Sequence, residues 1–200
     1  MENKKNVIEI QGLEIKIHTF QYGWEEIEIV SDYWNVHFNA SYLGQEPVAS
    51  LIHAIYELEF GGTCRPGGDE VDYEYDIQWI SEPGNLNMKF RRTGEVLNVH
   101  LTKALDYVDK VKFKEDIWFT IPFGMCKKEV IRVSLCLLKE YGICGYYESW
   151  SDKKDFPLGI LFRLIIGGCN EDSHGKSISD LLSESCFLRD LANNQLNQKI

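Results

Sequence analysis

The amino-acid sequence predicts an α+β fold, a mostly antiparallel twisted sheet of about six to eight strands covered by a helix at residues 47–60 and by C-terminal helices. Apolar and polar residues alternate along residues 7–42, 69–101 and 111–121, which is the period of a strand. Residues 47–60 and 127–141 instead carry apolar residues at helical spacing. The order strands, helix, strands, helices favours an antiparallel α+β fold over parallel β-α-β units.

Length and composition predict a single soluble domain that spans residues 1–200. Of the 200 residues, 44% are hydrophobic and 26% are charged, which is typical of a globular chain long enough to bury a core. Residues 61–68 are rich in glycine and predict a loop. If the domain has an internal boundary, which we call the seam, it is expected in this loop. The polar tail at residues 193–200 is expected to fray.

The first part of the chain predicts up to four short strands. In the third of them, Ile27 and Ile29 alternate with glutamates, so that one face is apolar and the other is acidic. Pro47 marks the start of the helix that follows, because proline is tolerated in the first turn of a helix. The four strands cover residues 7–10, 13–20, 24–31 and 32–42.

Residues 69–101 have the most regular pattern and predict three strands joined by tight turns at residues 81–84 and 93–95. One face of the first strand is apolar and aromatic, whereas the other carries carboxylates at alternate positions. The second strand places Lys89 and Arg91 on its polar face, beside these carboxylates if the two strands are antiparallel neighbours. We call the carboxylates the acidic row; they are Glu70, Asp72, Glu74 and Asp76.

After residue 101 the pattern changes from strand to helix. One strand is expected to stop at Pro122, which has no N–H to donate to a sheet. Gly142 follows the next helix at the position where glycine commonly ends a helix. The elements predicted here are a strand at residues 111–121 and helices at residues 127–141, 156–166 and 177–191.

Negative charge is concentrated in the first half of the chain. Residues 1–100 contain 17 Asp and Glu against 7 Lys and Arg, whereas residues 101–200 contain 14 of each, so the net charge of −10 comes from the first half. Nucleic-acid binding is not expected, because phosphate contacts need a basic surface. The negative charge is interpreted either as a sign of a basic protein partner or as a means of keeping the protein soluble. The sequence does not predict an oligomeric state.

The sequence predicts a cytoplasmic protein that does not enter a membrane. Residues 1–5 are followed by no long apolar run, so no secretory signal is expected. The longest apolar stretch, residues 156–166, is too short for a bilayer, which takes about 20 residues. The six cysteines include no CxxC pair and are expected to be reduced thiols, several of them in the core.

The acidic row is the first candidate binding site. Carboxylates suit Ca²⁺ or Mg²⁺. However, alternate residues of a strand stand about 6.5–7 Å apart and do not converge on one ion, so no metal site and no cofactor is predicted. The row is interpreted first as a solvated face and second as a surface for a partner protein.

Two other places are candidates if the protein is an enzyme. Glu82 lies at a hairpin tip near Trp79, where aromatic neighbours would raise its pKa and suit it to acid–base catalysis. Cys169 and His174 could form a nucleophilic dyad, or a zinc site with Cys186. A turn and a surface loop are the simpler interpretations. No common nucleotide-binding, metalloprotease or hydrolase motif occurs, which favours a protein without catalytic activity.

One set of segments resembles a known class of bacterial proteins. The run at residues 33–43, the helix from Pro47 and the turn at residues 79–84 are similar to small bacterial proteins, some of them grouped with the immunity proteins of polymorphic toxin systems. The resemblance covers at most about half of the chain. It implies a cytoplasmic acidic protein that blocks the active surface of a basic toxin and has no chemistry of its own.

The predicted function is therefore non-enzymatic binding of another protein through an acidic, aromatic-rich surface, as an immunity-type inhibitor of a basic toxin. Five tryptophans and ten tyrosines agree with this prediction, because aromatic residues are enriched at protein interfaces. The alternative is a small enzyme or ligand-binding protein that uses Glu82 or the loop of Cys169 and His174.

Overall fold

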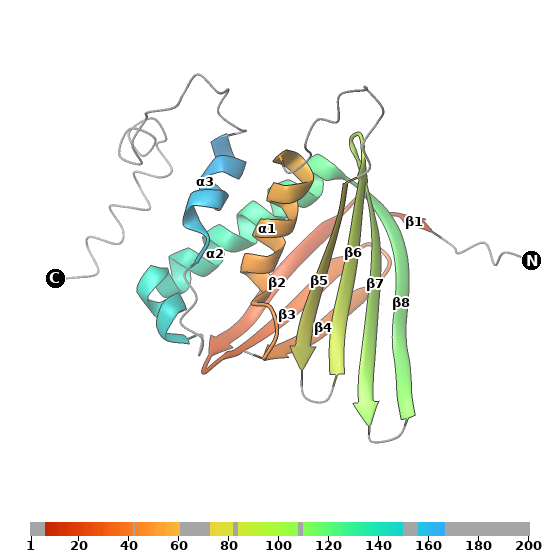
Figure 1. Cartoon of the computed structure of the whole chain (residues 1–200), viewed down its shortest axis with the longest axis horizontal. Helices are drawn as coiled ribbons and strands as arrows, with labels where there is room; N and C mark the ends of the chain where they lie inside the picture. The colour runs from red at the N-terminus through yellow and green to blue at the C-terminus, as the bar shows by residue number, and fades with distance from the viewer. Residues whose placement is uncertain are drawn as a thin grey trace, which may run out of the picture.

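The computed structural model describes residues 7–41, 43–60, 73–81, 84–107, 110–149 and 156–166. These residues form three helices and eight strands (Figure 1), so the predicted α+β class is confirmed. The strands are β1 (Ile8–Glu9), β2 (Leu13–Gln21), β3 (Trp24–Ser31), β4 (Asn35–Ser41), β5 (Tyr73–Ser81), β6 (Gly84–Thr93), β7 (Val96–Tyr107) and β8 (Lys110–Pro122). The helices are α1 (Pro47–Phe60), α2 (Phe123–Ser149) and α3 (Leu158–Ile166).

The strands form two sheets. Sheet A has the order β1-β8-β7-β6-β5, in which β5 to β8 are antiparallel neighbours and the short strand β1 runs parallel to β8. Sheet B has the order β2-β3-β4 and is antiparallel. Along the chain, β2 to β4 precede α1 and form sheet B, whereas β5 to β8 follow α1 and form most of sheet A. The short strand β1 crosses from the N-terminal segment to join sheet A. The sequence pattern identifies the strands but carries no signal for their division between two sheets.

The strands of sheet A remain paired up to short connections. Ser81 pairs with Gly84, and Thr93 pairs with Val96, so only two residues separate the paired ends in each case. Gly94 in the second loop has a φ of 58°, in the left-handed region that glycine adopts readily. Short loops of this kind fix which side chains of neighbouring strands stand opposite one another.

The core lies between the inner faces of the two sheets and the helices. The rings of Phe38 and Trp79 lie 6.4 Å apart and those of Trp34 and Phe119 lie 5.0 Å apart, so sheet B packs over the inner face of sheet A. Trp79 is fully buried and donates a hydrogen bond from Nε1 to Ser50 Oγ of α1, at 2.9 Å. The alternate apolar residues of β5 to β8 face this core: Ile77, Trp79, Leu86, Met88, Phe90, Leu97, Val99, Leu101, Phe119 and Ile121.

The three helices agree with the predicted ones to different degrees. Helix α1 has the predicted bounds, and α3 begins at Leu158 within the predicted range. Helix α2 begins at Phe123, earlier than predicted. Gly142, the predicted end of this helix, has a φ of 67° and interrupts it, but the helix resumes and continues to Ser149. The predicted seam, last helix and tail lie outside the described residues, at residues 61–68, 177–191 and 193–200.

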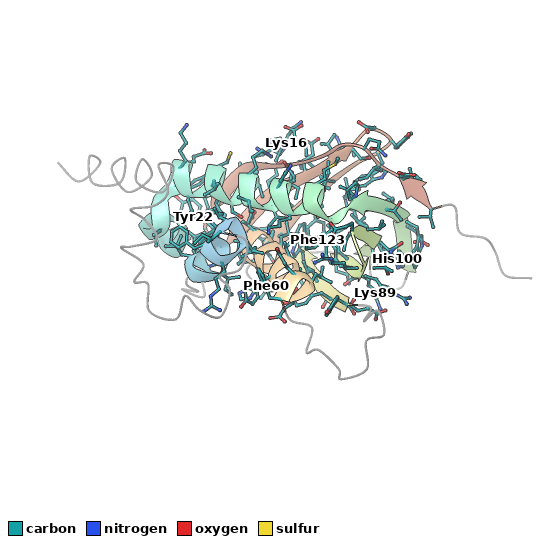
Figure 2. All side chains as sticks on the ribbon, turned by 90° about the horizontal axis from the view of Figure 1, so that it is seen from above. Lys16, Tyr22, Phe60, Lys89, His100 and Phe123 are labelled. Carbon is teal, nitrogen blue, oxygen red and sulfur yellow. The ribbon has the colours of Figure 1, made fainter. Side chains whose placement is uncertain are left out.

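Helix α2 lies along the free edge of sheet B (Figure 2). The backbone N–H of Ile15 in β2 donates to Glu129 Oε1 at 2.5 Å, and the Ile15 carbonyl accepts from Arg132 Nη2 at 2.5 Å. Arg132 also donates two hydrogen bonds to Glu129, at 2.6 and 2.8 Å. Together the two side chains occupy the place of a neighbouring strand, which protects this sheet edge from other chains.

Candidate functional site

The structure describes two of the four residues in the acidic row. Glu74 and Asp76 lie on the outward face of β5, and their side chains are 69% and 68% exposed. The other predicted site residues lie outside the described part of the chain: Glu70, Asp72, Glu82, Cys169 and His174.

Each described carboxylate of the row faces a base on β6. Asp76 lies 3.7 Å from Lys89 Nζ, and Glu74 lies 3.8 Å from Arg91 Nε. The partners stand directly opposite in the register, so the predicted cross-strand pairing is confirmed. Exposed pairs of this kind contribute only about 0–1 kcal/mol and rearrange readily. This part of the surface therefore carries mixed charge.

Aromatic and polar groups continue across the next two strands. His100 of β7 and Trp118 of β8 stack with ring centroids 3.7 Å apart and an interplanar angle of 14°. Both rings contact Asp116 Oδ1, His100 through Nε2 at 2.7 Å and Trp118 through Nε1–H at 3.1 Å. Because the carboxylate accepts from both rings, it holds the stack in one orientation and places the proton of a neutral His100 on Nε2.

Two open depressions hollow the outward side of sheet A. One has a volume of about 490 Å³ and the other about 580 Å³, and they share Asp76 and Lys89. Their lining residues come from the strands, from Val7 and from the linker at residues 43–45, and none belongs to a helix. We call this surface the outer face of sheet A; its main side chains are Glu74, Asp76, Gln78, Asn87, Lys89, Arg91, His100, Thr102 and Trp118.

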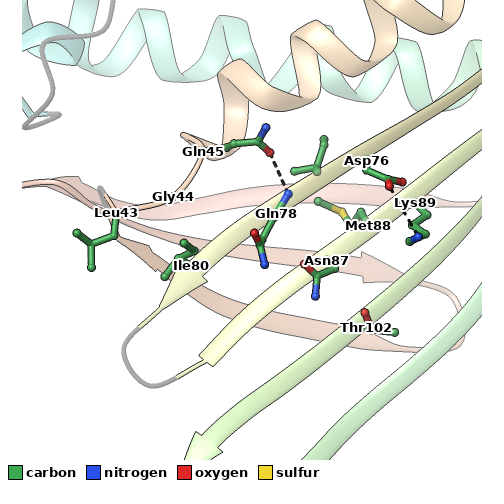
Figure 3. Close-up of a pocket in the computed structure, with 11 residues that line it drawn as sticks. Leu43, Gly44, Gln45, Asp76, Gln78, Ile80, Asn87, Met88, Lys89 and Thr102 are labelled. Atoms are coloured by element: carbon green, nitrogen blue, oxygen red, sulfur yellow. Dashed lines mark hydrogen bonds and ion pairs between the residues drawn. The ribbon is translucent and has the colours of Figure 1, made fainter.

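The linker that leads into α1 closes the β5 edge of this face, as Figure 3 shows. Gln45 donates its backbone N–H to the Gln78 carbonyl at 3.4 Å, and its side-chain Oε1 accepts from the Gln78 N–H at 2.9 Å. Gly44 lies so near β5 that a Cβ at this position would stand 2.8 Å from the backbone nitrogen of Ile80. Leu43, Gly44 and Gln45 all line the larger depression. The position of the linker therefore shapes the outer face.

A buried pair of carboxyl groups adjoins the linker. Glu25 of β3 is 0% exposed, and Glu46, the residue before α1, is 3% exposed. Glu46 caps the helix, because its carboxylate accepts the N–H groups of Val48, at 3.2 Å, and of Ala49. Burial, together with the neighbouring charge of Glu46, raises the pKa of Glu25 well above its usual value.

Sequence reasoning missed this pair, although one signal was available. Glu25 has the same strand parity as Ile27 and Ile29, so an acidic residue occupies the apolar face of β3. A carboxyl group on a core-facing position is costly unless it is protonated or paired. The partner could not be predicted, because Glu46 reaches Glu25 from a different element of the fold.

A second polar cluster lies on the outward side of sheet B. His18 Nε2 is 3.2 Å from Glu28, His37 Nε2 is 3.0 Å from Glu26, and the two imidazole rings are 5.7 Å apart. Each histidine pairs with its own glutamate, and the four groups do not converge on one point. Within the described residues, no group of three or more His, Cys, Asp or Glu side chains could hold a metal ion.

The two thiols that the structure describes differ in exposure. Cys126 is buried in the core, as predicted for several cysteines, and burial raises the pKa of its thiol to about 12. A thiol of this kind does not act as a nucleophile near neutral pH. Cys136 is exposed on α2.

Among the described residues, none of the helices has the length and the apolar character that a membrane span requires.

Comparison of the chain with protein-family models, with curated proteins and with solved structures finds no significant match in any of the three. The chemistry of the described surface is therefore the basis on which a function is proposed.

Proposed function

We propose that this protein binds another protein through the outer face of sheet A and has no catalytic activity of its own. The observation that carries the proposal is the pair of adjoining depressions, which share Asp76 and Lys89 and bring exposed charged pairs close to the Trp118–His100 stack. Protein interfaces are enriched in Trp and Arg and have polar rims, and the outer face offers both features.

A basic partner fits the charge of the chain. The net charge of −10 attracts a positively charged protein from a distance and raises its association rate. Close contact at the outer face would then depend on Trp118 and on the rearrangement of weak pairs such as Asp76 with Lys89. In its more specific form, the proposal is that the partner is a basic toxin and that this chain is its immunity-type inhibitor.

The enzyme alternative has no comparable support. Its residues, Glu82, Cys169 and His174, all lie outside the described part of the chain. The His100–Asp116 pair is oriented like an acid–base dyad, but Trp118 covers one face of the imidazole. We therefore propose a recognition role for this cluster.

Site-specific photo-crosslinking in the native cell tests the proposal. A crosslinking side chain at Asn87 lines the larger depression, whereas the same side chain at Lys16 lies on sheet B, away from Lys89 and His100 (Figure 2). We expect one discrete crosslinked protein from position 87 and none from position 16. Equal capture at both positions, or no capture at position 87, would contradict the proposed face.

Two variants connect that capture to particular contacts. Removal of a central aromatic anchor commonly costs 2 kcal/mol or more of binding, about a 30-fold loss of affinity. Trp118→Ala should therefore strongly reduce crosslinking from position 87. Thr19→Ala, a change on sheet B, is the matched control and should leave it unaltered. The affinity for the captured protein should also fall as salt is raised, as electrostatic attraction requires.

A further inference from the structure

The buried carboxyl pair, Glu25 and Glu46, joins three parts of the fold. Glu25 belongs to sheet B, Glu46 is the cap of α1, and Tyr146 of α2 lies against both and is 1% exposed. Phe20 of β2 stacks on the ring of Tyr146, with centroids 5.2 Å apart, and helps to enclose the cluster. The outer face of sheet A uses none of these side chains for contact, so the pair needs a separate explanation.

The hydrogen bonds indicate that the pair holds one proton. Glu46 accepts two backbone N–H groups of α1, so it is the member stabilised as a carboxylate. Neither oxygen of Glu25 receives a hydrogen bond from a described group. A proton on Glu25 would supply an O–H donor directed at Glu46, as in other carboxyl pairs that cannot both ionise.

No described cation compensates a second negative charge at this place. The titratable groups that act on the pair from neighbouring elements are Tyr146 and Tyr141, both on α2, and both are neutral at ordinary pH. The charge of Glu46 and of Glu25 also raises the pKa of Tyr146, after the larger effect of burial. Ionisation of Glu25 would therefore place two carboxylates in contact inside the core, at a high cost in free energy.

Movement of the linker would relieve this repulsion. Glu46 directly follows Gln45, which makes the two hydrogen bonds to Gln78. Gln45 in turn follows Gly44, which lies against Ile80. These residues line the larger depression of the outer face (Figure 3). Withdrawal of Glu46 toward water would draw the linker away from β5 and change the shape of the face.

We propose that loss of the Glu25 proton releases the linker at residues 43–45 from β5, so that pH regulates the outer face of sheet A. This inference rests on the proposed function for its biological meaning, because the regulated surface is the proposed binding face. The structural event itself takes place in the free protein and needs no partner.

The test is a pH titration of the free protein followed by the backbone amide signals of Gln45 and Gln78 in NMR spectra. In the natural protein both signals should shift in one common step at a pH above the range in which an exposed glutamate titrates. In Glu25→Gln, which keeps the shape but cannot ionise, the step should be absent. Glu14→Gln, at an exposed position on β2, should keep the step.

A second variant, Glu46→Gln, keeps the proposal testable if Glu25→Gln does not fold. Glu46→Gln retains an oxygen that can cap α1 but removes the charge that repels an ionised Glu25, so the common step should become smaller and move to lower pH. The inference is overturned if Gln78 shows no step in the natural protein, or if Glu25→Gln shows the same step. Either result leaves the crosslinking prediction at Asn87 intact, whereas failure of crosslinking does not alter the behaviour of Gln78.

Discussion

A Cβ atom on Gly44 would lie 2.8 Å from the backbone nitrogen of Ile80 and 3.1 Å from its Cβ, so the linker and β5 touch at a distance that only glycine permits. Gly44→Ala should therefore push the linker away from β5 and weaken the bonds between Gln45 and Gln78. Overpacking of this kind costs about 1–3 kcal/mol. Chemical denaturation would measure the loss in free energy of unfolding.

Gly124→Ala is the control for this change. Gly124 lies in α2, and a Cβ there meets nothing within 4 Å. Because alanine is the better helix residue, this variant should be stabilised by up to about 1 kcal/mol. If Gly44→Ala were as stable as Gly124→Ala, the close approach of the linker to β5 would be wrong.

The buried pair predicts that stability falls as pH rises. Burial raises the folded-state pKa of Glu25 above its unfolded value of about 4.3, so the folded protein holds this proton to higher pH. The stabilising effect is complete below the unfolded pKa and is lost as pH rises through the folded pKa. Between the two, the free energy of unfolding should fall by about 1.4 kcal/mol per pH unit.

Denaturation curves at several pH values above the unfolded pKa of glutamate would measure this slope. Glu25→Gln should remove most of it and be the more stable protein at the upper end of the range. Glu46, whose pKa burial also raises, contributes in the same direction. A natural protein that gains stability over this range would show that the pair is not protonated as inferred.

The pair of Asp76 with Lys89 should matter little for stability. Their side chains are 68% and 67% exposed and 3.7 Å apart, which is the geometry of a weak surface pair. Asp76→Asn should change the free energy of unfolding by less than about 1 kcal/mol. A larger loss, measured by thermal or chemical denaturation, would mean that the pair has a structural role. Asp76 and Lys89 would then not be free to exchange each other for groups of a partner protein.

The sequence predicted most of the local structure because strand period and turn residues are local properties. The alternation along residues 69–101 assigned the inward side chains of three strands, and the tight turns placed Lys89 beside Asp76. The division into two sheets depends on packing between distant segments, such as Trp34 against Phe119. No period in the sequence encodes that contact.

The candidate site was predictable only in part for the same reason. The stack of His100 on Trp118 could not be predicted, because it requires the pairing of β7 with β8 and the shared contact with Asp116. The importance of Gly44 likewise depends on its distance from Ile80, which lies far along the chain. Chemistry formed between strands is visible only once the register is known.

Glu129 and Arg132 of α2 both bind the backbone of Ile15 at the edge of β2. Glu129 is 8% exposed and accepts the Ile15 N–H, while it also pairs with Arg132. Glu129→Ala would leave the amide of Ile15 unsatisfied and Arg132 without this carboxylate, and the unsatisfied amide should cost about 1–3 kcal/mol. Hydrogen exchange of the Ile15 amide should become faster, whereas Lys139→Ala, an exposed change on the same helix, should alter neither quantity. An unchanged exchange rate at Ile15 in Glu129→Ala would show that α2 does not protect this edge.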